Sequence, residues 1–233
     1  MSDNPQGVFI DDVEFPFDDS TSILEFSNKS LGEKIIPTLC DDDNLKPYGA
    51  CRVCSVEVQH TEDGPKRTVA SCHTPINPGM RIYTNSDSVK TLRRNIVELV
   101  LSDHPPDCLT CEVNGNCELQ DVAASVGVRK IRYAKGKNHC DREKDLSHAY
   151  MRMDLSKCIN CSRCVRACDE VQGQFTLTMT GRGFESRITT DNDMLFGDSS
   201  CVSCGACAQT CPTSAISDVF QSKSVEADKT VRT

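Results

Sequence analysis

Apolar and polar positions alternate in short runs near the N-terminus, as they do in β-strands. Val8 to Ile10 and Val13 to Phe17 lean apolar on either side of two aspartates. This arrangement predicts a short hairpin that opens a sheet. Residues 22–31 come next and predict a short helix.

Two further runs predict a second pair of strands. Residues 51–58 and 68–71 alternate in the same way, and the acidic, glycine-containing segment 61–66 between them predicts the turn. Together with the hairpin and the helix, these strands predict a small α+β domain over residues 1–84.

The period then changes to that of an amphipathic helix. The apolar positions that recur at helical spacing are Val89, Leu92, Ile96 and Leu99. Asp87 stands where an N-cap side chain belongs, and Pro105 and Pro106 follow the last apolar position. We therefore expect a helix from Asp87 to about Ser102.

The rest of the chain divides at changes in cysteine spacing and polarity. Residues 85–150 predict a second domain that ends in a basic, irregular connector over 128–150. Residues 151–220 predict a third domain with an internal repeat, because the spacing of its first four cysteines recurs in its last four. Residues 221–233 are polar without an apolar period, which predicts a tail or linker.

Composition narrows the possible functions. The chain has 233 residues, sixteen cysteines and a net charge of −8, without a basic stretch that would suit nucleic acid. Residues 1–17 lack the basic and apolar regions of a secretory signal, and the apolar stretch 96–101 is too short to span a bilayer. We therefore expect a cytoplasmic protein with reduced thiols, without membrane insertion, whose modest cores are stabilised by metal ligation.

The cysteine spacing of the third domain is typical of bacterial ferredoxins. The segment CVSCGACAQTCP at 201–212 matches C-x2-C-x2-C-x3-C-P, and CINCSRCVRAC at 158–168 repeats it with Asp169 in place of the proline. In this motif the fourth cysteine of each run completes the other cluster. Two ligand sets follow: a first crossed set of Cys158, Cys161, Cys164 and Cys211, and a second crossed set of Cys201, Cys204, Cys207 and Cys168. Zinc ribbons are the alternative, but they use pairs rather than triplets of cysteines.

A different spacing near the N-terminus predicts a 2Fe-2S site. We define the N-terminal set as Cys40, Cys51, Cys54 and Cys72, which follow the pattern C-x10-C-x2-C-x17-C. One isolated cysteine, a close pair and a distant fourth follow the order found in plant-type ferredoxins. Gly49 and Ala50 are small enough for backbone N–H groups to approach the sulfides. A structural zinc site is the alternative.

The remaining spacing, H-x3-C-x2-C-x5-C, contains only three cysteines. We define the His104 set as His104, Cys108, Cys111 and Cys117. A 4Fe-4S cluster takes four ligands, so His104 is the candidate for the fourth; otherwise it only caps the preceding helix. Cys140 is left over as a non-ligating thiol. We expect the other histidines to be ordinary surface or loop residues: His60, His73, His139 and His148.

These four sets, in this order over residues 40–211, resemble the iron-sulfur region shared by three kinds of enzyme. They are the large iron-sulfur subunit of respiratory complex I, the iron-only hydrogenases, and the α-subunit of NAD-dependent formate dehydrogenases that contain molybdenum or tungsten. The resemblance implies an α+β chain with a plant-type ferredoxin-like 2Fe-2S domain, a small 4Fe-4S domain ligated by one histidine and three cysteines, and a bacterial two-cluster 4Fe-4S ferredoxin-like domain. The implied cofactors are one 2Fe-2S cluster and three 4Fe-4S clusters.

Within this family, three features resemble the formate dehydrogenases. Both crossed sets are present, whereas the complex I subunit usually keeps one cluster there; GRGFESRI at 181–188 and the linker-like DKTVRT at 228–233 point the same way. The resemblance implies a relay between a molybdopterin-containing formate dehydrogenase catalytic subunit and a flavin NAD-binding subunit with its small 2Fe-2S partner.

The sequence itself carries no catalytic constellation, because it contains neither a G-x-G-x-x-G motif nor a P-loop. The alternatives are a relay in a hydrogenase or in a complex I-like NADH dehydrogenase, a free ferredoxin-like carrier, and a zinc-stabilised interaction module.

Overall fold

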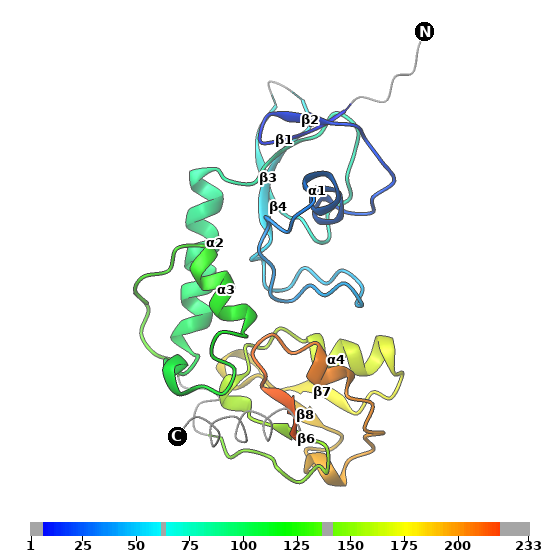
Figure 1. Cartoon of the computed structure of the whole chain (residues 1–233), viewed down its shortest axis with the longest axis vertical. Coiled ribbons are helices and arrows are strands. Elements are labelled where there is room, and N and C mark those ends of the chain that lie inside the picture. The colour runs from blue at the N-terminus through cyan, green and yellow to red at the C-terminus, as the bar shows by residue number, and fades with distance from the viewer. Residues whose placement is uncertain (1–6, 62–63, 137–141, 220–233) are drawn as a thin grey trace, which may run out of the picture. The chain divides into compact units, whose positions relative to one another are not determined.

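The computed structural model describes residues 7–61, 64–136 and 142–219 (Figure 1). The chain divides into two compact units. Unit 1 comprises Met1–Asp41, Pro47–Val97 and Val122–Val128, and unit 2 comprises Asp42–Lys46, Glu98–Asp121 and Arg129–Thr233. Cys140 and the expected tail lie outside the described residues. No helix of the described segments combines the length and the apolar character needed to cross a membrane.

Unit 1 is built on a five-stranded sheet in the order β2-β1-β5-β3-β4. Its strands are β1 (Val8–Ile10), β2 (Val13–Phe15), β3 (Ser55–Gln59), β4 (Arg67–Ala70) and β5 (Arg81–Tyr83). Both predicted antiparallel pairs, β1 with β2 and β3 with β4, are confirmed. The short strand β5 was not predicted; it joins the two pairs by lying parallel to β1 and antiparallel to β3.

The first hairpin closes through a two-residue turn. Asp11 and Asp12 both have positive φ angles, 47° and 69°. A two-residue hairpin turn of this hand requires positive φ at both positions, and aspartate tolerates it better than most residues. Asp11 also accepts a 2.7 Å hydrogen bond from the backbone N–H of Thr84, which ties the turn to the end of β5.

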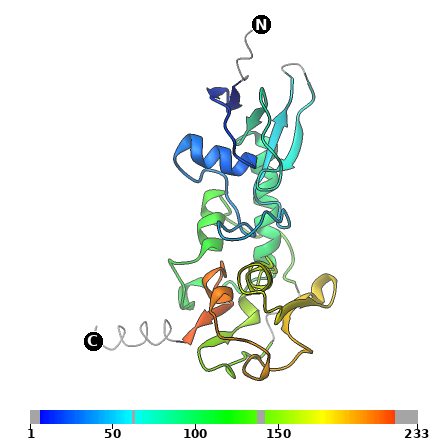
Figure 2. The same cartoon turned by 90° about the vertical axis from the view of Figure 1, so that its right-hand side faces the viewer.

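Helix α1 (Ile23–Leu31) packs on this sheet, as both views show (Figures 1 and 2). The Ser22 hydroxyl accepts the backbone N–H of Glu25, and Gly32 ends the helix with a φ of 69°. The helix buries Ile23 and Phe26 in the same core as Val8 and the other inward-facing strand residues. The predicted helix over 22–31 is therefore confirmed, with Ser22 as its N-cap.

Helix α2 (Asp87–Ser102) is also confirmed, but its predicted cap is wrong. The hydroxyl of Ser86 accepts the Val89 N–H at 3.2 Å, so Ser86 is the N-cap and Asp87 is the first helical residue. The buried Arg93 fixes this helix to the sheet by donating to the carbonyls of Ser55 and Thr84 at 3.0 and 3.1 Å.

Unit 2 contains two small antiparallel sheets and short helical turns around the cysteine runs. The strand pairs are β6 (Met151–Met153) with β9 (Ile216–Asp218) and β7 (Leu177–Thr180) with β8 (Arg187–Thr190). The α-helices are α4 (Arg163–Arg166), α5 (Ala206–Gln209), the start of α3 (Glu118–Ser125) and the end of α2. The 3-10 helices are η1 (Cys108–Thr110), η3 (Leu155–Lys157), η5 (Gly183–Glu185) and η6 (Phe196–Asp198), and η4 (Ala167–Val171) is a π-helix.

The predicted connector is irregular, as expected. Its described parts, 128–136 and 142–150, contain neither a helix nor a strand, apart from an isolated bridge between Asp145 and Met153. Each cysteine run of the internal repeat leads into a short helix, α4 or α5. The sequence repeat is therefore also a repeat of local structure.

Candidate metal-cluster sites

The N-terminal set gathers at the loop before β3 and the end of β4 in unit 1. The Sγ atoms of Cys54 and Cys72 lie 3.4 Å apart, and the Cys51 N–H points to the Sγ of Cys40 at 3.4 Å. Arg52 has a φ of 63°, which turns the chain between the two cysteines of the close pair. The structure thus brings all four thiols of the set into one site.

The thiols of this site influence one another strongly. The pKa of Cys54 is lowered to about 7, chiefly by its hydrogen bond with the Cys72 thiol. The pKa of Cys72 is raised by the same bond, by burial and by the nearby Cys40. Such a pair shares a proton when free, and metal binding replaces that proton because the ligand is the thiolate. The donor set therefore fits a 2Fe-2S cluster.

In unit 2, the three cysteines of the His104 set also lie together. Cys108 and Cys111 share the turn η1, in which the Cys111 N–H donates to the Cys108 carbonyl at 3.2 Å. Burial raises the pKa of Cys117, and the two other thiols raise it further. His104 continues the last turn of α2 through a bond from its N–H to the Leu101 carbonyl. Its ligation remains a prediction.

The first crossed set is assembled from both cysteine runs. The pKa of Cys158 and that of Cys161 are raised to about 12, chiefly by burial, and in both cases Cys211 contributes in the same direction. The pKa of Cys164 is also raised, first by burial and then by Cys161, Cys211 and Cys158. The thiol from the second run therefore lies among the thiols of the first.

The second crossed set has the reciprocal arrangement. The pKa of Cys207 is raised to about 12, chiefly by burial and then by Cys201 and Cys204, and Cys168 of the first run contributes in the same direction. Cys168 likewise raises the pKa of Cys201. Cys204 is the exposed member of the set, whereas Cys168 and Cys207 are buried.

Buried thiols whose protonated form is favoured suit a multi-iron cluster, since several irons compensate the charge of several thiolates. Within residues 7–61, 64–136 and 142–219, no three His, Cys, Asp or Glu side chains converge as they would on a single metal ion. In a cluster, by contrast, the four ligands are spread over two or four irons, so they need not all meet at one point.

Ion pairs connect the loop of the His104 set to the cysteine runs. Arg163, between two cysteines of the first run, donates to both carboxylate oxygens of Glu118 at 2.7 and 2.8 Å. It also donates to the Thr210 carbonyl at 3.2 Å. Glu118 follows Cys117, and its N–H donates to the Pro212 carbonyl at 3.1 Å. These bonds join three ligand-bearing segments.

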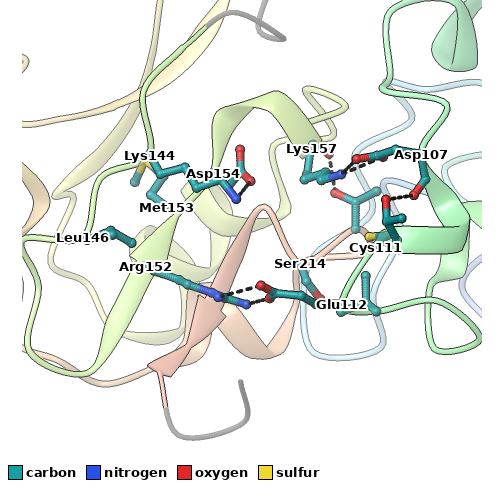
Figure 3. A pocket seen from close by; sticks show the side chains of 13 residues that line it. Asp107, Cys111, Glu112, Lys144, Leu146, Arg152, Met153, Asp154, Lys157 and Ser214 are labelled. Carbon is teal, nitrogen blue, oxygen red and sulfur yellow. Dashed lines mark hydrogen bonds and ion pairs between the residues drawn. The ribbon is translucent and has the colours of Figure 1, made fainter. Parts of the chain in front are cut away.

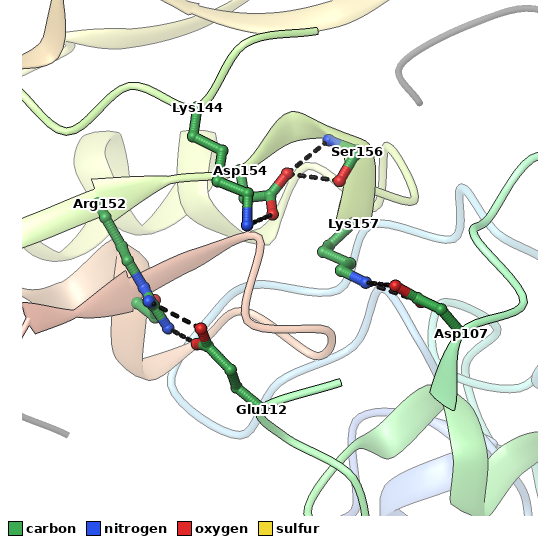
Figure 4. Close-up of polar contacts among 8 residues, drawn as sticks. Asp107, Glu112, Lys144, Arg152, Asp154, Ser156 and Lys157 are labelled. Carbon is green, nitrogen blue, oxygen red and sulfur yellow. Dashed lines mark hydrogen bonds and ion pairs between the residues drawn. The ribbon is translucent and has the colours of Figure 1, made fainter. Parts of the chain in front are cut away.

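Further pairs surround a cavity of about 120 Å³, which is lined by parts of 107–113 and 152–157, by Lys144 and Leu146, and by Thr213 and Ser214 (Figure 3). Lys157 points to Asp107, with its Nζ 2.8 Å from a carboxylate oxygen, and Arg152 pairs with Glu112. Lys144 pairs with Asp154, whose carboxylate also accepts from Ser156 (Figure 4). Every charged side chain that lines this cavity is thus matched by one of opposite sign.

The histidines outside the four sets differ from one another. His60 and His73 are exposed, as expected, and His139 lies outside the described residues. His148 lies in a loop but is only 8% exposed, so it is a buried residue rather than an ordinary surface one. The sequence signal that identifies it is weak, because His148 stands in a polar connector 53 residues before the run that it contacts.

Three family models match successive parts of the chain. Residues 7–87 match a 2Fe-2S iron-sulfur cluster binding domain, residues 93–132 match the NADH-ubiquinone oxidoreductase-G iron-sulfur binding region, and residues 157–215 match a 4Fe-4S dicluster domain. These matches support an iron-sulfur protein with one 2Fe-2S region followed by 4Fe-4S regions, including ferredoxin-like domains.

Relatives of several kinds are similar to the chain. NADP-reducing hydrogenase subunit HndD of Solidesulfovibrio fructosivorans is 41% identical over 78% of this chain and 31% of its own length. An NADH-quinone oxidoreductase subunit of Rhizobium meliloti (strain 1021) is 31% identical over 90% of this chain and 23% of its own length. A candidate formate dehydrogenase of Staphylococcus haemolyticus (strain JCSC1435) is 31% identical over 91% of this chain and 20% of its own length. The chain therefore spans less than a third of these relatives.

A solved structure has the same fold. A chain of an NAD⁺-reducing [NiFe]-hydrogenase in the H₂-reduced state superposes with a TM-score of 0.80 at 29% identity, covering 92% of this chain and 87% of that chain. The similarity extends over all three matched regions.

Proposed function

We propose that this chain is an electron-relay subunit that holds one 2Fe-2S cluster and three 4Fe-4S clusters. The N-terminal set would hold the 2Fe-2S cluster, and the His104 set and the two crossed sets would each hold a 4Fe-4S cluster. The observation that carries this proposal is the gathering of cysteines into separate groups within regions that match iron-sulfur families. When bound, such clusters accept and donate single electrons.

The protein's own contribution is to hold and tune the sites. Backbone N–H groups aimed at cysteine sulfurs, buried thiols and the Arg163 guanidinium next to the ligands are the features that adjust a cluster's potential. The chain would therefore act within a larger oxidoreductase whose other subunits hold the substrates.

For the catalytic partner, we infer a molybdopterin-containing formate dehydrogenase subunit, with a flavin NAD-binding subunit and its small 2Fe-2S partner at the other end of the relay. Support comes from the presence of both crossed sets, from the segment 181–188, and from similarity to a candidate formate dehydrogenase over 91% of the chain. Segment 181–188 forms the tight connection of β7 to β8. There Gly181 has a φ of 74°, and a Cβ would lie 2.4 Å from the Glu185 carbonyl oxygen.

A hydrogenase is the second candidate partner. It is favoured by the 41% identity to a subunit of an NADP-reducing hydrogenase and by the superposition on a chain of an NAD⁺-reducing [NiFe]-hydrogenase. Both candidates share the relay role and differ in the enzyme that supplies the electrons.

A pull-down from native cells with this chain as bait distinguishes the two. The recovered complex is assayed for dye reduction with formate and with hydrogen, and for molybdenum, tungsten and nickel. Formate-dependent activity with molybdenum or tungsten is expected. Hydrogen-dependent activity without either metal would refute the formate proposal and support the hydrogenase. A chain that runs alone, without partners, would contradict both and support a free carrier.

A further inference from the structure

The loops that open the two cysteine runs share a backbone feature. Asn160 and Ser203 each stand two residues after the first cysteine of their run, with φ angles of 52° and 59°. In each loop the backbone N–H of that residue donates to the preceding cysteine: Asn160 to the Sγ of Cys158 and Ser203 to the Sγ of Cys201, both at 3.4 Å. The left-handed turn therefore aims one N–H at a ligand sulfur in each loop.

This conformation is unfavourable for a residue other than glycine, so it needs support from the surroundings. In the first loop, the Asn160 side chain provides it by donating to the Ser186 carbonyl at 2.9 Å. In the second loop, the Ser203 hydroxyl lies 3.2 Å from the Nε2 of His148. The repeat thus keeps the backbone turn but changes the anchor from a carbonyl to an imidazole.

Hydrogen bonds fix the form of this imidazole. The backbone N–H groups of Tyr150 and Met151 both point to the Nδ1 of His148, at 3.1 and 3.2 Å. A ring nitrogen that accepts carries no proton, so in the neutral ring the proton is on Nε2 and is donated to Ser203. The ring also packs against the fully buried Phe196, with 4.8 Å between the centroids.

The segment that carries His148 is itself held in place. Asp145 accepts the Phe196 N–H at 2.7 Å, and the Ser147 hydroxyl accepts the Gly197 N–H at 2.8 Å. The approach is close enough that a Cβ on Gly197 would lie 2.4 Å from the Ser147 carbonyl oxygen. His148 is therefore presented to Ser203 from a fixed backbone.

We propose that His148 is a positioning residue that holds the loop of Cys201 and Cys204, so that the Ser203 N–H donates to the Cys201 sulfur. A hydrogen bond to a ligand sulfur stabilises the more negative, reduced cluster and raises its potential. The proposal rests on the proposed function, because it requires a cluster at the second crossed set. His148 would then raise the potential of that cluster alone.

Two variants of the full chain separate the hydrogen bonds at Nδ1 of the ring from the one at Nε2. His148→Asn keeps an acceptor where Nδ1 stands but is too short to reach Ser203. His148→Gln places an amide donor near the position of Nε2. Ser203→Ala removes the acceptor, and Asn160→Ala is the matched change in the first loop. Each protein is measured by iron content and by redox titration followed by EPR, with the signal lost in Cys204→Ser identifying the cluster.

We expect His148→Asn and Ser203→Ala to lower the midpoint potential of that cluster by similar amounts, and the double variant to lower it no further. His148→Gln should restore the wild-type value. Asn160→Ala should lower only the potential of the cluster held by the first crossed set. Unchanged potentials, or a double variant that shows the sum of both shifts, would overturn the proposal. If His148→Asn loses the cluster, retention in His148→Gln supports the proposal, and loss in both variants overturns it. A wild-type chain without this cluster would overturn the proposed function as well.

Discussion

The ion pair between Arg163 and Glu118 should stabilise the first cysteine run, and Glu118→Gln tests this. The Arg163 side chain is 4% exposed and that of Glu118 is 49% exposed, so the cation is buried while the anion is partly in solvent. Glutamine keeps the shape and one acceptor oxygen but removes the charge. Arg163 then keeps its bond to the Thr210 carbonyl and loses its counterion.

The size of the effect follows from the two bonds between these residues. Hydrogen bonds to charged groups contribute about 1.5–3 kcal/mol, and glutamine can accept only one of the two, so the loss of the other costs about 2 kcal/mol. Loss of one partner of a fully buried pair costs about 3–5 kcal/mol, which the exposure of Glu118 reduces. We therefore expect a loss of about 1–2 kcal/mol, which corresponds to an equilibrium constant for local opening that is about 5- to 30-fold larger.

Hydrogen exchange followed by mass spectrometry measures this opening in the iron-loaded protein. The peptides of interest cover α4 and the π-helix η4, whose amides are hydrogen bonded in the structure. Asp193→Asn is the matched control, because it breaks the bidentate pair with Arg187, in which the Asp193 side chain is 59% exposed. An exposed pair contributes about 0.2–1 kcal/mol, so hydrogen exchange in the peptides that contain Asp193 and Arg187 should change by less than about 5-fold. If Glu118→Gln changes exchange no more than the control does, the pair does not stabilise the run.

Other predictions concern the clusters directly. Metal analysis should give about fourteen irons per chain and negligible zinc, and about six irons or stoichiometric zinc would contradict the partition into four sets. His104→Ala should alter only the cluster of the His104 set, whereas His104→Cys should keep that cluster at a lower potential, because a thiolate adds negative charge; an unchanged EPR spectrum of His104→Ala would show that His104 is not a ligand. Cys168→Ala should perturb the cluster of the second crossed set although Cys168 lies in the first run, and a loss confined to the first crossed set would reject crossed ligation.

Local patterns predicted much of unit 1. The hairpin of β1 and β2, the helix α1 and the helix α2 were all expected, because alternation, helical spacing and capping residues act within a few positions. Strand β5 was missed because it has three residues and its parallel partner β1 lies about seventy positions earlier, so only the tertiary fold defines it. The N-cap was assigned one residue late, since Ser86 and Asp87 are both good capping residues.

The sequence likewise predicts some features of the candidate sites and not others. Cysteine spacing predicts which thiols form a set, because the spacing within each run belongs to one loop and its motif. Spacing says nothing of the buried Arg93 or of His148, whose partners lie far away in the chain. Polar residues of this kind look ordinary in sequence, and only their burial and hydrogen bonds distinguish them.

The bonds around Pro212 and Arg163 also bear on how the protein matures. The Pro212 carbonyl follows Cys211 and accepts the Glu118 N–H, while Arg163 stands between Cys161 and Cys164 and holds Glu118 from the other side. Placing the ligands of the first crossed set therefore also places Cys117. We expect iron insertion at these two positions to be cooperative, so that native mass spectrometry of partly reconstituted protein shows both filled or both empty. Glu118→Gln should allow singly filled intermediates to accumulate, and their accumulation in the wild-type chain would show that the two positions fill independently.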